Sequence, residues 1–315
     1  MYTNKRVLLV AGGGTLGTYT AEELLRRGCR VDIICPEEKK TENPRLRFIR
    51  GYATEGLLCE LFSQVHYDGI VNFLHYKTVE EYRPHHELLI KNTDHLIFLS
   101  SYRVYADEQH PITEDAPRLT EIVKDEEFFV TEDYAVPKCR CEDFLRSECS
   151  GQRWTIVRPV ISFSALRFDL LVYSGSDISR HFEADRPLIM PESVRDLCAG
   201  IDWAGNSGKL IAGLLFKPET IGEAYTVSSA QNMTWGEVAG IYEELMGVRI
   251  EWRDESQLAE SYPLILGEKR WLWKYDRRFD RRIENSKILA ATGLKKSDFL
   301  SIRDGLEIEL KRDKM

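Results

Sequence analysis

The sequence lacks the features that mark several large classes of protein. Its seven cysteines are an odd number spread along the chain, and Cys139 and Cys141 have no second pair at metal-ligand spacing, so we expect no metal site. The longest apolar runs are too short to span a membrane, and the first six residues are too polar to begin a secretion signal. A formal charge of −8 gives no general attraction to nucleic acid or to anionic membranes. These absences predict a globular cytoplasmic protein.

The sequence does contain an alternation of short apolar runs and helical patterns over its first 100 residues. The runs that read as strands are 6–12, 30–35, 45–51, 68–74 and 95–101, and those that read as helices are 20–28, 56–65 and 79–92. Parallel neighbouring strands need such crossovers, so the alternation predicts an α/β fold with a Rossmann-like, doubly wound parallel sheet. A length of 315 residues favours two lobes.

A glycine motif stands where the first strand meets its helix. Gly12, Gly14 and Gly17 form G-x-G-x-x-G, which turns the chain, lets backbone N–H groups approach a pyrophosphate, and allows close helix–strand packing. Thr15 and Leu16 begin the helix, whose free N–H groups and positive dipole end would face the anion. The pattern therefore predicts a dinucleotide site, although the same glycines could form a plain structural turn.

A second pattern indicates proton transfer. Tyr134 and Lys138 are four residues apart and share one helical face, so the ammonium could lie beside the phenol and favour its ionised form. Ser101 follows the fifth predicted strand, at the carboxyl edge where ligands of such sheets bind. Together these residues predict a general acid/base unit that acts on a substrate hydroxyl. Taken alone, the Tyr–Lys spacing is also typical of a solvated helix face.

These motifs resemble the extended short-chain dehydrogenase/reductases, the group of NAD-dependent nucleotide-sugar epimerases and dehydratases. The stretch "LVAGGGTLG" is similar to the family's glycine opening, "SSYRVYA" to its catalytic serine turn, and "YAVPK" to its Tyr–Lys helix. Segments that resemble successive landmarks of the family's second half are 157–159, 191–201, 222–247 and 285–295.

The resemblance implies roles for particular residues and regions. Ser101, Tyr134 and Lys138 would be catalytic, the last two would also contact the cofactor, and Lys77 falls where a cofactor-contacting lysine lies. Residues 1–159 would form the dinucleotide-binding domain, completed by 187–228, and a smaller substrate-binding lobe would comprise 160–186 and 229–315. A homodimer would form through the helices at 79–92 and 134–149.

Departures from the family leave the choice between NAD and NADP open. Ala11 stands where the first glycine usually lies, and Cys35 takes the place of the acid that would bind the adenosine ribose, so we expect Cys35 beside the cofactor. Lys39 and Lys40 could receive a 2′-phosphate or could belong to a solvated loop. His75 could face the cofactor pocket or could be a hydrogen-bonded histidine at a strand end.

Candidate substrate residues lie in the second half. Arg167 and Arg180 lie where the family begins to wrap its substrate, and they could pair with a diphosphate. The basic and aromatic cluster 267–282, which contains Arg277, could hold a nucleotide, could pack against the rest of the protein or a partner, or could bind nucleic acid. The acidic chain argues against the last, so we expect no nucleic-acid partner.

The residues after the serine bear on the reaction. Tyr102 and Arg103 stand where dehydratases of the family have an acidic pair, so dehydration lacks its expected acid and base. Epimerisation or carbonyl reduction needs only Ser101, Tyr134, Lys138 and a nicotinamide. We therefore expect an NAD- or NADP-dependent oxidoreductase acting on a nucleotide sugar or a related hydroxyl or carbonyl substrate. The alternative is a non-catalytic, cofactor-binding regulatory or interaction protein on the same fold.

Overall fold

The computed structural model describes residue 2 and residues 4–313, and its centre is a seven-stranded parallel sheet. The strands are β1 (Arg6–Val10), β2 (Arg30–Cys35), β3 (Leu46–Arg50), β4 (Gly69–Asn72), β5 (Leu96–Leu99), β6 (Trp154–Pro159) and β10 (Ala224–Val227). Their order in the sheet is β10-β6-β5-β4-β1-β2-β3. Because the chain runs outward in both directions from β1, a crevice opens at the carboxyl ends of β1 and β4. The predicted α/β fold is confirmed.

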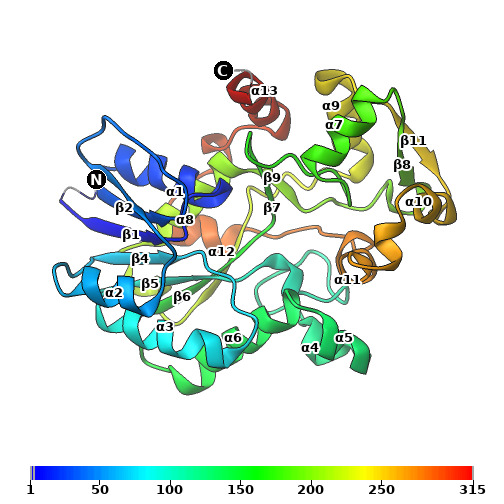
Figure 1. Cartoon of the computed structure of the whole chain (residues 1–315). Helices are drawn as coiled ribbons and strands as arrows, with labels where there is room; N and C mark the ends of the chain where they lie inside the picture. The colour runs from blue at the N-terminus through cyan, green and yellow to red at the C-terminus, as the bar shows by residue number, and fades with distance from the viewer. Residues whose placement is uncertain (1, 3, 314–315) are drawn as a thin grey trace.

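Helices cover both faces of this sheet (Figure 1). Val7 and Leu9 of β1 pack with α1 (Thr15–Arg26), α8 (Ala204–Leu214) and α12 (Ser286–Thr292). Leu8 and Val10, which point the other way, pack with α2 (Glu55–Phe62) and α3 (Val79–Lys91), and α6 (Ala135–Glu148) lies beside α3 on this face. Burial on both faces explains why β1 reads as a continuous apolar run instead of an alternating one.

A smaller lobe follows β6 and lies to the right in Figure 1. Two short sheets build it, one from β7 (Ile161–Phe163) and β9 (Ile201–Trp203), the other from β8 (Leu188–Pro191) and β11 (Ile250–Arg253). The chain returns to the main sheet through α8 and β10, whereas β8, inside the range expected to complete that sheet, pairs within the smaller lobe.

The remaining helices are mostly short. They are α4 (Leu119–Ile122), α5 (Glu126–Thr131), α7 (Gly175–Glu183), α9 (Trp235–Met246), α10 (Glu255–Ser261), α11 (Arg270–Leu272) and α13 (Ile302–Asp313). Within the described part of the chain, every helix is too short or too polar to cross a bilayer. The same residues hold no cluster of histidine, cysteine and acidic side chains suited to a metal ion.

Candidate active site

The glycine loop joins β1 to α1 at the carboxyl edge of the sheet, and its three motif glycines meet different surroundings. A Cβ added to Gly17 would lie 2.2 Å from the carbonyl oxygen of Gly12, and one added to Gly12 would lie 2.6 Å from the Cβ of Leu9. At Gly14, by contrast, no described atom lies within 4 Å of an added Cβ. Gly14 also caps α1, and no described side chain accepts from the first N–H groups. This open cradle of N–H groups fits a pyrophosphate.

The residues on either side of the cradle are held in unusual ways. Ala11 has a φ of 56°, the left-handed region in which glycine is relaxed and alanine is strained, at the position where the family usually has glycine. Thr15 Oγ1 lies 3.0 Å from Ser164 Oγ in a hydrogen bond that ties the start of α1 to the smaller lobe. Leu16, one residue on, reaches the cavity described below.

The loop after β2 brings both a cation and an acid to the glycine loop. Lys39 Nζ donates to the carbonyl oxygen of Gly13 at 2.6 Å, whereas Lys40 is exposed. Glu37 Oε2 lies 3.1 Å from where a Cβ on Gly13 would be. Cys35 is buried, and this burial raises the pKa of its thiol, so the charged group nearest this strand end that could accept from ribose hydroxyls is the Glu37 carboxylate and not the thiol. Lys77 is exposed just beyond β4, with its backbone N–H donating to Glu81.

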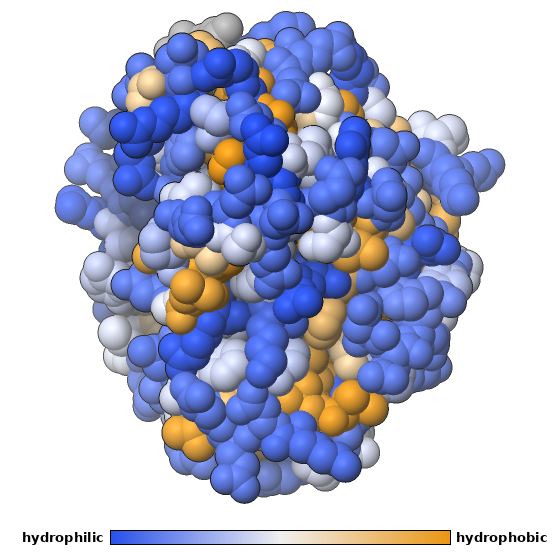
Figure 2. Space-filling model, turned by 90° about the vertical axis from the view of Figure 1, so that its right-hand side faces the viewer, coloured by the Kyte–Doolittle hydropathy of each residue, from blue (hydrophilic) through white to orange (hydrophobic). Residues whose placement is uncertain are grey.

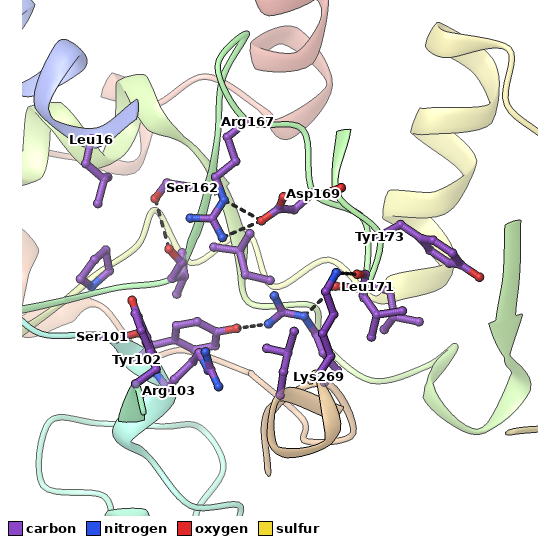
Figure 3. A pocket seen from close by; sticks show the side chains of 18 of the residues that line it. Leu16, Ser101, Tyr102, Arg103, Ser162, Arg167, Asp169, Leu171, Tyr173 and Lys269 are labelled. Carbon is purple, nitrogen blue, oxygen red and sulfur yellow. Dashed lines mark hydrogen bonds and ion pairs between the residues drawn. The ribbon is translucent and has the colours of Figure 1, made fainter. Parts of the chain in front are cut away.

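A cavity of about 360 Å³ brings the predicted acid/base residues together with the start of α1 (Figure 3). Ser101 enters it from the end of β5, Tyr134 from the residue that precedes α6, and Leu16 from α1. Arg167 and Arg277 line it from the smaller lobe. The cavity therefore lies between the carboxyl edge of the sheet and the smaller lobe, where the sequence placed the reaction.

Lys138 is buried beneath this cavity. Its ammonium donates to the carbonyl oxygen of Leu99 at 2.5 Å and to that of Leu74 at 3.4 Å, so it binds the main chain at the end of β5 and just beyond β4. Burial lowers the pKa of Lys138 to about 8. The expected influence of Lys138 on the phenol stays a prediction, since the contacts of the ammonium are with carbonyl groups.

Two other side chains lie over the ring of Tyr134. The His75 ring stacks on it with centroids 5.3 Å apart, and the Arg103 guanidinium lies 4.6 Å from its centroid. His75 Nε2 is 2.8 Å from the carbonyl oxygen of Asp133, and burial, followed by the charge of Lys138, lowers the pKa of His75. His75 is thus hydrogen-bonded and stacked on the Tyr134 ring, and the cavity that it lines is a separate one, which it shares with Tyr76 and His85. The sequence analysis noted Arg103 only as a missing acid, because no local pattern shows what a long side chain reaches.

Ser101 has a local role besides its place in the cavity. Its Oγ accepts a hydrogen bond from the backbone N–H of Arg103 at 3.2 Å, which caps the short 3₁₀ turn Tyr102–Val104. This bond fixes the side-chain rotamer, so the hydroxyl is held at the cavity wall. The oxygen retains its own O–H as a donor.

The predicted substrate arginines fall in different places. Arg167 lines the cavity, is half exposed, and forms an ion pair with Asp169 at 2.6 Å. Arg180 lies on the outer side of α7, exposed and paired with Asp177 one helical turn earlier. The structure therefore brings Arg167 to the reaction centre and leaves Arg180 elsewhere.

Arg277 lines the cavity but is buried and engaged. It donates to the carbonyl oxygen of Leu171 at 2.7 Å and to the Tyr102 hydroxyl at 2.8 Å, and it forms an ion pair with Asp276. Lys269, which the sequence analysis did not single out, also lines the cavity. Burial lowers the pKa of Lys269.

The aromatic part of the cluster 267–282 packs against other parts of the protein, with Trp273 buried and Trp271 and Tyr275 partly buried. Trp271 stacks on Tyr275 with an interplanar angle of 24°, and both contact Phe128 of α5, while Arg270 pairs with Glu127 at 3.0 Å. Figure 2 shows the face that carries α11 as mostly hydrophilic, with scattered small hydrophobic spots. Of the roles considered for this cluster, packing against the rest of the protein is therefore the one that these rings have. Arg277, further along the segment, lines the cavity.

No family model and no curated protein sequence matches the chain. Solved structures match it over nearly all of its length. Epimerase Mth375 from Methanothermobacter thermautotrophicus has a TM-score of 0.71 at 16% identity, covering 98% of this chain and 92% of that one. The UDP-glucuronic acid 4-epimerase from Bacillus cereus, in complex with UDP-glucuronic acid and NAD, has a TM-score of 0.69 at 15% identity, covering 98% and 99%.

The Bordetella bronchiseptica enzyme WbmH in complex with NAD⁺ is similar to the same degree, with a TM-score of 0.69 at 16% identity, covering 99% of each chain. At such identities the likeness establishes the fold and leaves the function to the site. The resemblance to the extended short-chain dehydrogenase/reductases is thus confirmed for the fold.

Proposed function

We propose that this chain is an NAD- or NADP-dependent oxidoreductase that epimerises or reduces a nucleotide sugar or a related hydroxyl or carbonyl substrate. The observation that carries the proposal is the shared cavity, in which Ser101 and Tyr134 meet the start of α1. A proton-transfer group and a dinucleotide cradle then act on one substrate. Two enzymes of the same fold that were solved with NAD support it, and one of them is the UDP-glucuronic acid 4-epimerase that also holds UDP-glucuronic acid.

The residues present fit a dinucleotide. Gly14 and the free N–H groups of α1 would hold the pyrophosphate, and Lys39 beside the loop would meet the adenosine side, where its charge suits a 2′-phosphate. We also propose contacts from Lys77 and Lys138, as the family resemblance implies. When bound, the nicotinamide supplies a hydride acceptor or donor.

The protein's own part in the reaction is proton transfer and orientation. Tyr134 Oη would take the proton from a substrate hydroxyl or return it to a carbonyl oxygen, and Ser101 Oγ would donate a hydrogen bond to the same oxygen. Arg167 would bind an anionic group of the substrate, since a guanidinium presents paired donors to phosphate or carboxylate oxygens. Dehydration is disfavoured because Tyr102, bound to Asp276, and Arg103 supply no carboxylate there.

The test combines identification of bound molecules with turnover. Small molecules released from freshly purified protein are identified by mass spectrometry, and a panel of nucleotide sugars is followed by NMR for epimerisation and by nicotinamide absorbance for reduction. Tyr134→Phe should reduce turnover by about 10²–10⁴-fold and leave dinucleotide affinity largely intact. Ser101→Ala should be milder, because the base remains. Binding of a dinucleotide without any turnover would favour the non-catalytic alternative, and equal turnover by Tyr134→Phe would refute the mechanism.

The homodimer is proposed on the family resemblance alone. The exposed residues of α3 and α6 are largely charged: Glu80, Glu81, Glu87, Lys91, Arg140, Asp143, Arg146 and Glu148. An interface through these faces would rest on charge pairs more than on apolar burial, and we therefore expect it to weaken with salt. Light scattering at low and high ionic strength tests this, and a monomer at both would count against the dimer.

A further inference from the structure

Arg103 lies at the junction of two cavities beside the reaction centre. It lines the 360 Å³ cavity together with Ser101, and it also lines a second cavity of about 490 Å³. Tyr134, Lys269 and Leu272 are shared by the same two cavities. The side chain is therefore placed where any shift of Tyr134 would change the shape of the reaction space.

The surroundings of Arg103 fix its guanidinium against the Tyr134 ring. The guanidinium carbon Cζ lies 4.6 Å from the ring centroid. Nη2 donates to Glu132 Oε1 at 3.4 Å, and Nε lies 3.7 Å from Asp276 Oδ2. Among the described residues Nε is buried without a hydrogen-bond partner. The contact with the ring and the two carboxylates therefore account for where this cation lies.

Glu132 connects this cation to the backbone of the same tyrosine. Its other oxygen, Oε2, accepts from the backbone N–H of Tyr134 at 3.0 Å and from that of Val136 at 2.8 Å. One buried carboxylate thus fixes the start of α6 and faces the guanidinium that covers the ring. Glu132 therefore links the backbone of Tyr134 to the cation that lies over its ring.

We propose that Arg103 is a positioning residue that, together with Glu132, holds the Tyr134 ring at the wall of the reaction cavity. This inference rests on the proposed role of Tyr134 in proton transfer. A cation over an aromatic face is attracted by the ring quadrupole, and a displaced proton-transfer group loses the near-attack geometry on which its rate depends. Lys138 does not serve this purpose, because its ammonium is bound to main-chain carbonyl groups.

The kinetic test compares Arg103→Met with Arg103→Lys. We expect Arg103→Met to lower kcat by about 10- to 100-fold with little change in KM or in dinucleotide affinity, because the geometry of proton transfer is lost and binding is not. Arg103→Lys keeps the charge over the ring and should restore part of kcat. Arg249→Met, at an exposed position of the smaller lobe that lines neither cavity, is the control and should behave as wild type. Unchanged kcat, or a rise in KM alone, would overturn the positioning role.

A second measurement needs no substrate. In protein carrying ¹³C-labelled tyrosine, Tyr134→Phe identifies the ring signal of Tyr134 by its disappearance. Arg103→Met should move that signal and Arg249→Met should leave it in place, because only the first change removes the cation from the ring. If Arg103→Met does not fold, Arg103→Gln, which also removes the charge, serves instead. An unmoved signal contradicts the positioning role whatever the activity, whereas a moved signal in a protein without turnover contradicts only the proposed function.

Discussion

Alanine at Gly17 and alanine at Gly14 should separate the packing role of the glycine loop from its binding role. An added Cβ at Gly17 would lie 2.2 Å from the oxygen and 2.5 Å from the carbonyl carbon of Gly12. Both are backbone atoms, which cannot swing aside as a flexible side chain can. The Gly17→Ala protein must therefore move α1 away from the end of β1.

The structure sets the size of the two effects. Overpacking a close contact costs about 1–3 kcal/mol, and a clash with backbone belongs at the upper end, so Gly17→Ala should lower Tm by about 5 °C or more. Gly14→Ala meets open space at a φ of −89°, which alanine adopts freely, and should cost less than about 1 kcal/mol. Yet its methyl group occupies the cradle, so dinucleotide affinity should fall by about tenfold or more.

Thermal unfolding by circular dichroism and calorimetric titration with NAD and with NADP measure the two quantities on the same samples. The reasoning fails if Gly17→Ala melts within about 1 °C of wild type, since the clash would then be absorbed without strain. It also fails if Gly14→Ala is the less stable variant. Wild-type affinity in a stable Gly14→Ala protein would remove the loop from the proposed binding site.

Three further changes test individual charges. Burial lowers the pKa of Lys138 to about 8 from its usual 10.5. The free-energy cost of burying the charged ammonium is therefore complete below pH 8 and fades toward pH 10.5. Lys138→Met should therefore stabilise the fold at pH 7 by about 1–2 kcal/mol after the loss of two hydrogen bonds, and less at pH 10, as thermal melts at both values will show. Burial alone would raise the pKa of Glu142, but the ion pair with buried Arg158 outweighs burial and the pKa is lowered. The contribution of this ion pair to the free energy of unfolding is therefore present above the usual pKa of 4.5 and is lost as pH falls. Glu142→Gln should cost about 3–5 kcal/mol in urea unfolding at pH 7 and less at acidic pH, and an equal cost at both would contradict the ion pair. Lys39→Ala should weaken NADP by about tenfold and NAD little in calorimetry, whereas equal losses would exclude a 2′-phosphate contact.

The fold could be predicted from the sequence because burial on both faces of a parallel sheet leaves uninterrupted apolar runs. Each of the five runs read as strands contains one. β2 ends where its run ends, and the structure ends the other four strands one or two residues before the end of their runs, where the chain turns at the sheet edge. The strands β6 and β10 are further apart in sequence, and β8 could not be assigned to a sheet by pattern. Its partner β11 lies about 60 residues away, and pairing over that distance leaves no local signal.

The candidate site could be predicted in part, and the reason differs from residue to residue. Gly14, Ser101 and Tyr134 directly follow a strand or precede a helix, so topology alone brings them to one edge. Lys138 lies one turn further along α6. The spacing shows which helix face it shares with Tyr134, but it does not show that the ammonium binds carbonyl groups at the end of β5 and just beyond β4. Arg103 reaches its partners across 29 residues or more, and no sequence pattern reports such contacts.

The cations of the cavity are not equally free to bind a substrate, and this decides where an anionic group would go. The Arg277 side chain is only 5% exposed and donates to the protein on three sides, whereas that of Arg103 is 17% exposed and lies against the Tyr134 ring. The Lys269 side chain is 28% exposed, and its ammonium donates to a carbonyl oxygen and to the Tyr262 hydroxyl. The Arg167 side chain is 53% exposed, and its ion pair is with Asp169, two residues away. An exposed pair of this kind contributes little free energy, so a ligand can compete for the guanidinium at little cost. We therefore expect an anionic substrate to meet Arg167 first, with the other cations forming the wall behind it.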